Sequence, residues 1–359
     1  MFDIKEVFTG KKRLVGLDIG SNSLKLAEIV SSSRGPVLNR FFQRPLPKGI
    51  IVEGNVEDPR ALTAHLKELF RNSGCKGRGV VTSLSGNAVI IKKVAFAQME
   101  EPELRDLIRD EAGKYLPFDN MAEVYYDFQI LGDNEYNPNQ MDVILVAAKK
   151  TDINNYLDPL SAAGLAVNIL DVDSFALETM YEANYDFEDN EIVVIVNIGA
   201  SITNINIIKN GMSIFTRDFT LGGNSVTEAL QEKYRISFDE AETIKLEGLA
   251  GEDQNREELP QAVLDCADPI CLEIERSIDY FRSTFGGDYI KHVYLAGGSA
   301  RISGLTENLS QRLNIETELI NPLLKIGFNK KNIDAGKIED IKTVGAVAIG
   351  LGLRKIGDK

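Results

Sequence analysis

The chain has 359 residues and a formal net charge of −14, with the apolar and charged fractions of an ordinary soluble protein. The acidic balance and the lack of a dense Lys/Arg face argue against a nucleic-acid binder. Three cysteines without a CxxC pair and only two histidines argue against a structural zinc site and indicate a reducing compartment.

The N-terminal stretch, MFDIKEVFTGKKR, carries acidic residues and no apolar core, so we expect no signal peptide. No run of about 18 apolar residues occurs, so we expect no membrane-spanning helix. Phe2, Ile4, Val7 and Phe8 can form one face of a short amphipathic turn. We expect that face to dock on the protein's own surface, because membrane binding usually needs more apolar area and a basic polar face.

The stretch VGLDIGSNSLKLAEI, residues 15–29, predicts a strand, a tight turn and a second strand. Asp18 stands at the start of the turn, Gly20 permits a close backbone approach, and Ser21–Ser23 offer short donors to an anion. Lys25 follows in the second strand, where it can add charge to the site or be solvated. An ordinary hairpin with a polar tip is the alternative interpretation.

Between this hairpin and residue 89, the pattern predicts an amphipathic helix and a buried strand. Residues 89–168 then give strands, a helix, two strands, a second helix and a further extended run. That order predicts a small α+β module of its own. Phe118, Tyr125 and Phe128 lie in this module, and we expect their rings in its core.

Residues 192–208, IVVIVNIGASITNINII, repeat the theme of the first hairpin. Asn197 stands where the first copy has Asp18, and the run Gly199–Ser201 matches the first turn. One such turn is weak evidence, whereas two in matching contexts predict a duplicated fold around a central cleft.

Most of the remaining second half has helical periodicity. Gly222–Gly223 leads into one helix, and the exposed edge of the next presents Glu242 and Lys245. A buried strand then breaks into a glycine turn at Gly297–Ser299. A short helix rich in small residues is predicted from Thr343 to Leu353.

In their order along the chain, these motifs resemble the five-motif set of the actin, sugar-kinase and DnaK ATPase superfamily. Asp18–Ser21 resembles phosphate loop one, Asn197–Ser201 resembles phosphate loop two, and Leu295–Ala300 resembles the adenosine loop. Residues 170–177 and the small-residue helix resemble the two connecting segments. The resemblance implies an α/β, duplicated actin-like (RNase H-like) two-lobe ATPase fold.

The inserted module, residues 89–168, narrows the resemblance to one family within this superfamily. EAGKYLPFDNMAEVYYDFQIL, residues 111–131, is similar to a signature of the PilM family of type IV pilus assembly proteins. FtsA also has an inserted α+β lobe here, but FtsA is expected to end in a basic amphipathic membrane helix, whereas this sequence ends at GLGLRKIGDK. The predicted lobes are a first lobe of residues 1–88, 169–191 and 340–359, an inserted lobe of residues 89–168, and a second lobe of residues 192–339 with a helical subdomain at 222–288.

The resemblance implies ATP and Mg²⁺ as ligands. Asp18 would face the water shell of the metal ion, whereas Asn197, in place of the family's second aspartate, keeps an oxygen and loses the charge. One charge near a divalent ion is worth on the order of a few kcal/mol, so we expect metal affinity and hydrolysis to suffer. The predicted ATP-binding residues are Gly20, Ser21, Asn22, Ser23, Lys25, Gly199, Ala200, Ser201, Gly222, Gly223, Glu242, Lys245, Gly297, Gly298 and Ser299.

Hydrolysis also needs a group that orients the attacking water. Asp173 is the predicted group, and Asp171 is the alternative; either acid can instead cap the helix that follows. We therefore predict ATP·Mg²⁺ binding with slow or absent turnover.

A member of the PilM family would be a cytoplasmic scaffold, peripheral to the inner membrane through its partner, with ATP as a structural ligand. The resemblance implies that it binds the cytoplasmic N-terminal tail of PilN between the inserted and first lobes, within an assembly complex of PilN, PilO and PilP. The alternatives are a small-molecule kinase of the same superfamily and an FtsA-like filament-forming protein.

Overall fold

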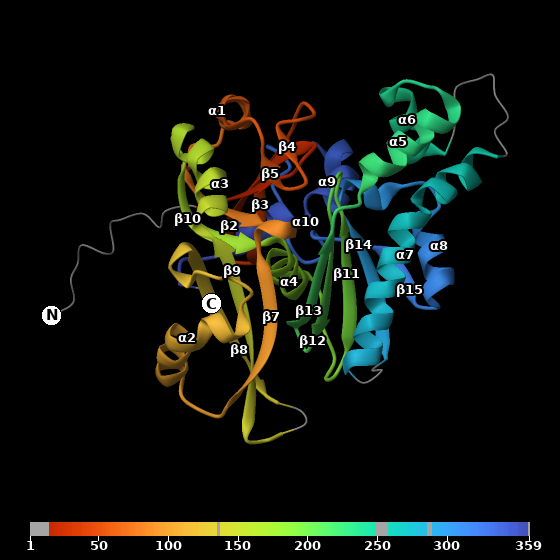
Figure 1. Cartoon of the computed structure of the whole chain (residues 1–359). Helices are drawn as coiled ribbons and strands as arrows, with labels where there is room; N and C mark the ends of the chain where they lie inside the picture. The colour runs from red at the N-terminus through yellow and green to blue at the C-terminus, as the bar shows by residue number, and fades with distance from the viewer. Residues whose placement is uncertain (1–13, 135–136, 249–257, 286–288, 358–359) are drawn as a thin grey trace.

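Two larger sheets and one small sheet organise the chain, as the computed structural model shows for residues 14–134, 137–248, 258–285 and 289–357 (Figure 1). The amphipathic turn predicted at residues 2–8 lies outside these ranges. Within them, no helix combines the length and the apolar composition that crossing a bilayer requires.

The first sheet has six strands in the order β10-β6-β1-β2-β3-β16. β1, β2 and β3 pair antiparallel, whereas β6, β10 and β16 pair in parallel with their neighbours. The strands are β1 Leu14–Ile19, β2 Ser23–Ser32, β3 Gly35–Pro45, β6 Gly79–Leu84, β10 Ala166–Val172 and β16 Gly327–Phe328; a two-stranded hairpin, β4 Ile51–Val52 and β5 Asn55–Val56, follows β3.

The second sheet has five strands in the order β13-β12-β11-β14-β15. Its first three strands in the chain are again antiparallel, and the next two again pair in parallel on the other side of the first. This order repeats β3-β2-β1-β6-β10, which is the duplication that the two hairpins predicted. The strands are β11 Ile192–Ile198, β12 Thr203–Lys209, β13 Met212–Phe219, β14 Ile290–Ala296 and β15 Glu316–Leu319.

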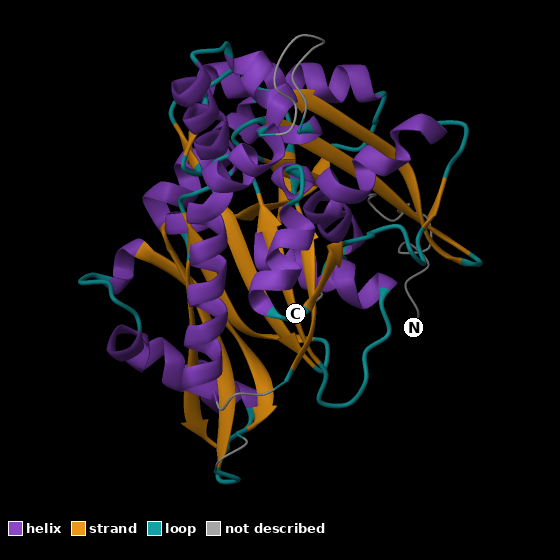
Figure 2. Ribbon diagram, turned by 90° about the vertical axis from the view of Figure 1, so that its right-hand side faces the viewer, coloured by secondary structure: helices purple, strands orange, loops and turns teal. Residues whose placement is uncertain are grey.

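Helices α4 and α10 lie between the two sheets, α1 and α3 cover the outer face of the first sheet, and α7 and α8 cover the outer face of the second (Figure 1 and Figure 2). Helices α5 and α6 pack on one end of α7, above the second sheet in Figure 1. Strand alternation explains the layers: Val193 and Ile195 of β11 face the central helices, and Val194 and Val196 face the outer ones. The helices are α1 Pro59–Ser73, α3 Lys150–Ala162, α4 Asp173–Asn184, α5 Gly223–Tyr234, α6 Phe238–Glu247, α7 Leu259–Phe285, α8 Leu305–Leu313, α9 Ile338–Val344 and α10 Ala346–Leu353.

The single helix predicted from Thr343 to Leu353 is wrong, because the structure has two helices, α9 and α10, that meet at Gly345. A Cβ added at Gly345 would lie 2.6 Å from the carbonyl oxygen of Ile341 and 3.1 Å from the ring of Phe41. Only glycine at position 345 therefore allows the junction to pack against the first sheet.

Glycines also let α10 approach the backbone of its neighbours. A Cβ added at Gly350 would lie 1.9 Å from the carbonyl oxygen of Ala176 in α4. A Cβ added at Gly16 in β1 would lie 2.1 Å from the carbonyl oxygen of Ala348 in α10. Real Cβ atoms do not approach so closely, so any side chain at these positions would force the backbones apart.

The insert is a three-stranded antiparallel sheet, β7-β9-β8, with α2 packed on one face. Phe118 and Phe128 pack against this core as predicted, but the prediction for Tyr125 is wrong, because its side chain is 54% exposed. Tyr126 faces α2, so strand alternation turns Tyr125 to the opposite face. These elements are β7 Ile90–Ala97, α2 Glu101–Tyr115, β8 Val124–Asp133 and β9 Gln140–Lys149.

Three segments pack or pair across the lobe boundaries that were predicted from the sequence. α3 follows β9 directly, yet its Leu160 lies in the core between α1 and the first sheet. β10 begins at Ala166 and pairs with β6, so residues 166–168 of the predicted insert lie in the first sheet. β16 pairs with β3, although it falls in the range predicted for the second lobe. The lobe boundaries therefore stay a proposal.

We expect Gly350→Ala to lower the free energy of unfolding by about 2 kcal/mol or more, because the new methyl group collides with the α4 backbone. Gly113→Ala in α2 is the matched control, since Gly113 is exposed and its added Cβ would meet only the flexible Met121 side chain at 3.4 Å. Because alanine favours a helix over glycine, the control should raise that free energy by about 0.5–1 kcal/mol. Denaturant titration measures both, and effects of the same sign would contradict the close packing.

Candidate functional site

Three turns from the two larger sheets enclose one cavity of about 390 Å³. The turns are the one after β1, the one after β11 and the one after β14. The predicted ATP-binding residues on its wall are Gly20, Ser21, Asn22, Ser23, Lys25, Gly199, Ala200, Ser201, Glu242, Lys245, Gly297, Gly298 and Ser299. The predicted metal and catalytic residues Asp18, Asn197 and Asp173 also line it.

Gly222 and Gly223, predicted to bind ATP, lie behind the cavity wall instead. The backbone N–H of Gly223 donates to the carbonyl oxygen of Gly199 at 2.9 Å. A Cβ added at Gly223 would lie 2.1 Å from Oγ of Ser299, and one added at Gly222 would lie 2.7 Å from the carbonyl oxygen of Ala200. These glycines therefore allow α5 to support the second turn from behind.

The first and second turns are equivalent in backbone geometry. The N–H of Gly20 donates to the carbonyl oxygen of Ser23 at 3.2 Å, and the N–H of Gly199 donates to that of Ile202 at 2.9 Å. In the third turn, Gly297 has a φ of +88°, and an added Cβ would lie 2.4 Å from the carbonyl oxygen of Ile198. Glycine is therefore required where the third turn meets the second.

The two hairpins differ in the charge of one cross-strand pair. Asp18 faces Lys25 across β1 and β2, and Nζ of Lys25 lies 2.8 Å from Oδ2 of Asp18. Asn197 faces Asn204 at the same seven-residue separation, and its Nδ2 donates to Oδ1 of Asn204 at 3.0 Å. Lys25, which the sequence allowed to be solvated, is thus paired inside the cavity, opposite a neutral amide pair.

Asp173 is the first residue of α4, and Val172, with no capping side chain, stands at the cap position. Oγ of Ser83 donates to Oδ1 of Asp173 at 2.5 Å. Burial, and then the charge of Asp18, raise the pKa of Asp173 to about 7. At neutral pH this carboxyl is therefore partly protonated, and its pKa lies in the range that suits a general base.

The alternative acid, Asp171, points away from the cavity wall. Its carboxylate accepts hydrogen bonds from Nε and Nη2 of Arg354 at 2.6 and 3.1 Å. Asp171 therefore holds the end of α10 against β10, and it is not among the residues that line the cavity.

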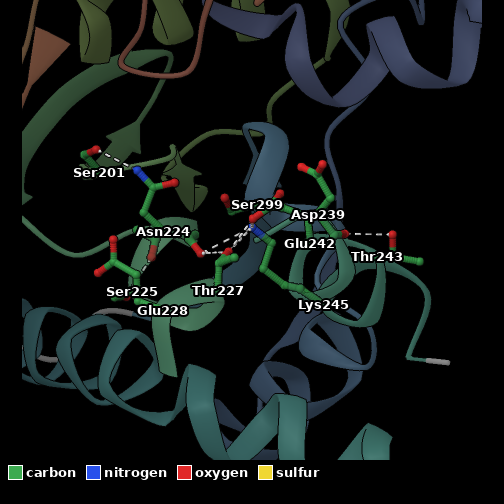
Figure 3. Close-up of polar contacts among 12 residues, drawn as sticks. Ser201, Asn224, Ser225, Thr227, Glu228, Asp239, Glu242, Thr243, Lys245 and Ser299 are labelled. Carbon is green, nitrogen blue, oxygen red and sulfur yellow. Dashed lines mark hydrogen bonds and ion pairs between the residues drawn. The ribbon is translucent and has the colours of Figure 1, made fainter. Parts of the chain in front are cut away.

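Glu242 and Lys245 belong to a partly buried polar cluster between α5 and α6, as Figure 3 shows. Nζ of Lys245 donates to Thr227 Oγ1 at 2.9 Å, to Glu242 Oε1 at 2.5 Å and to the Gly223 carbonyl at 3.2 Å. The prediction that Lys245 is exposed is wrong, because α5 packs over it and leaves the residue 4% exposed. Burial lowers the pKa of Lys245, while the hydrogen bond to Glu242 opposes that shift.

Several cavity residues were not predicted from the sequence. Arg301 follows the third turn directly and pairs with Asp340 of α9 at 2.5 Å, so its position next to a glycine turn was a usable signal. Asn224 donates to Oγ of Ser201 at 3.3 Å. Asn204 could have been predicted as a cavity residue by extending the comparison of the two hairpins to their second strands. The remaining ones are Ile19, Gln43, Ile51, Gly54, Ser85, Ile202, Leu246, Thr343, Val344, Ala346 and Val347.

A comparison with known families identifies the chain. The family model for the type IV pilus assembly protein PilM matches residues 16–356. The chain belongs to the PilM family. A solved PilM–PilN type IV pilus biogenesis complex is similar, with a TM-score of 0.84 and 29% identity, over 97% of this chain and 100% of that chain. The predicted family is therefore confirmed.

Two further relatives bear on the fold. Cell division protein FtsA of Bacillus subtilis is 24% identical over 257 residues, which cover 64% of this chain and 57% of that FtsA. The match thus spans little more than half of that relative. MreB 5 of Spiroplasma citri, solved bound to AMPPNP, has a TM-score of 0.52 at 13% identity, with 95% of each chain covered. The predicted actin-like fold with two lobes is confirmed by these structures.

The raised pKa of Asp173 determines how this residue affects stability at different pH values. Well below pH 4, the folded and unfolded states both hold the proton, so Asp173 has little effect. As pH rises towards 7, the unfolded chain ionises while the folded protein keeps its proton, which lowers the free energy of unfolding. Above about pH 7 both states are ionised and the loss levels off.

Asp173→Asn keeps an acceptor for Ser83 but cannot ionise. We expect its free energy of unfolding to be about 2–4 kcal/mol higher than that of the wild type at pH 8, and only slightly higher at pH 4. Asp158→Asn, at an exposed carboxylate of α3, is the matched control and should show no such pH-dependent gain. Denaturant titrations at the two pH values provide the comparison. A difference for Asp173→Asn that is equal at both values would contradict the buried, protonated carboxyl.

Proposed function

We propose that this chain is an ATP-binding scaffold of type IV pilus assembly that binds the cytoplasmic N-terminal tail of the inner-membrane protein PilN. The observation that carries the proposal is the convergence of three small-residue turns on one cavity in a chain of the PilM family. The likeness to the PilM of a PilM–PilN complex over the whole chain supports the choice of partner. The protein would act at the cytoplasmic side of the inner membrane, held there by its partner.

The cavity suits a nucleotide because its turns offer backbone N–H groups to phosphate oxygens and no large side chain blocks their approach. Gly20–Ser23 and Gly199–Ser201 would hold the phosphates from two sides, with Lys25 adding a positive charge. The hydrogen bonds described for Glu242 all reach Oε1, so Oε2 is available to a ribose hydroxyl. The ammonium of Lys245 is fully used within the protein, and its role is to position Glu242.

Hydrolysis should be slow or absent. The reason is not the raised pKa of Asp173, because a carboxyl with a pKa of about 7 can still act as a general base at neutral pH. The second hairpin supplies an amide in place of a carboxylate. The site therefore binds the phosphates without the charged groups that would promote transfer of the terminal one.

The residues fit Mg²⁺ poorly as a protein-held ion. Asp18 and Asn197 do present oxygen, the donor that Mg²⁺ prefers, and a bound ion would neutralise phosphate charge. However, Asp18 is already paired with Lys25, and Asn197 is uncharged. We therefore assign no step to the metal.

For PilN, we propose binding of an extended tail between the insert and the first lobe, with an ordering cost on binding. Tyr125 is the candidate contact, because it is an exposed aromatic side chain on the face of the insert sheet opposite α2. Exposed tyrosines are frequent anchors of protein interfaces, since they bury a large apolar area with little loss of conformational entropy.

We expect the wild type to bind ATP with a turnover below about one per second, which is slow for an enzyme. Ser21→Arg and Gly298→Glu should each abolish binding, because a long or negatively charged side chain would fill the space for the phosphates or the nucleoside. Ser283→Arg, at an exposed position of α7, should bind normally. Calorimetric titration and a phosphate-release assay test this, with circular dichroism to confirm folding. Tight ATP binding by both cavity variants would show that ATP does not bind in this cavity.

We expect a synthetic peptide with the sequence of the PilN tail to bind the full chain, and Tyr125→Ser to weaken binding about tenfold or more. Tyr280→Ser is the matched control, because Tyr280 is 53% exposed and lies on α7, which is not part of the insert. Fluorescence anisotropy with a labelled peptide, with and without ATP, measures the affinity. Equal weakening by both variants would argue against the insert as the docking site.

A further inference from the structure

We infer that nucleotide binding in this cleft is nearly indifferent to Mg²⁺, because Lys25 supplies the positive charge that a metal ion would bring to the phosphates. The inference rests on the proposed function, since it concerns how the same cavity selects between free ATP and Mg²⁺·ATP. It is carried by the cross-strand pairs of the two equivalent hairpins.

The duplication places two pairs on opposite sides of the cavity in the same register. Each pair joins the residue before the turn to the residue seven positions later on the returning strand. In the first hairpin the pair is Asp18 with Lys25, and in the second it is Asn197 with Asn204. The formal charge of these four side chains together is zero. Asp173 also lines the cavity, where its carboxyl accepts a hydrogen bond from Ser83.

Lys25 is held at the phosphate turn. Its Nζ lies 2.8 Å from Oδ2 of Asp18, and a Cβ added at Gly20 would lie 3.5 Å from that Nζ. The Lys25 side chain is only 14% exposed, so its ammonium faces the cavity and not bulk solvent. An ammonium at this position attracts phosphate oxygens and repels a metal ion approaching Asp18.

The second hairpin does not compensate for this repulsion. The amide of Asn197 can offer Oδ1, but its Nδ2 is hydrogen-bonded to Asn204, and neither residue carries charge. Among the residues that the structure describes, no group of three or more His, Cys, Asp and Glu side chains could hold a metal ion. The protein therefore gains little from an ion on the nucleotide, and it binds the phosphates with or without one.

The direct test is ATP affinity of the full chain, measured by calorimetry in excess Mg²⁺ and in excess EDTA. We expect the two dissociation constants to agree within about threefold. Binding that weakens tenfold or more in EDTA would overturn the inference while leaving the proposed function in place. Absence of binding in both solutions would overturn the proposed function, and the inference with it.

Two variants should create a dependence on the metal. Asn197→Asp adds a carboxylate opposite Asp18, and we expect it to bind Mg²⁺·ATP at least about tenfold more tightly than free ATP. Lys25→Gln removes the ammonium, frees Asp18 for an ion, and should shift the ratio in the same direction even if Asn197→Asp does not fold. Lys67→Gln, at an exposed position of α1, should keep the wild-type ratio. An unchanged ratio in folded Lys25→Gln would contradict the role given to Lys25.

Discussion

The close packing of α10 against both α4 and β1 is the constraint on which the rest of the structure depends. Because positions 16 and 350 are glycines, α10 packs against the backbone of the first sheet and of α4 without intervening side chains. The two central helices then share one core with the inner faces of both sheets. That core fixes how the sheets face each other, and so brings the turn after β1 opposite the turn after β11. The cavity is a consequence of this packing.

Within that geometry, the electrostatics favour holding a ligand over transforming it. An ion pair stands on one side of the cavity and an amide pair on the other. Asp173, another acid of the cavity, is half-buried and accepts a hydrogen bond from Ser83. Preorganised backbone donors remain strong in such an environment because they need no counter-charge, whereas chemistry at a phosphate needs charged groups at the right place. The cavity has these donors, but its second hairpin carries an amide where the first carries a carboxylate.

The sequence predicted the parts of the site that depend on local chemistry. A turn at Gly20 or Gly297 needs glycine whatever surrounds it, so residue type and spacing were sufficient. The errors concern positions that only tertiary packing decides. Lys245 lies on a polar helix edge and is buried only because α5 crosses it, while Tyr125 lies in an apolar strand whose second face is open. Asp173 could be placed in the cavity, but its raised pKa follows from burial beside Asp18, which no local pattern encodes.

The route of the chain out of the insert has a mechanical consequence. β9 passes without a linker into α3, whose Leu160 is anchored in the first core, and α3 is followed closely by β10 and then α4. β10 ends at Val172, next to the carboxyl that faces the cavity. A load applied to the insert would thus be carried through α3 and β10 to the segment that begins with Asp173. A tail bound to the insert and a ligand in the cavity would therefore act on the same segment of the chain.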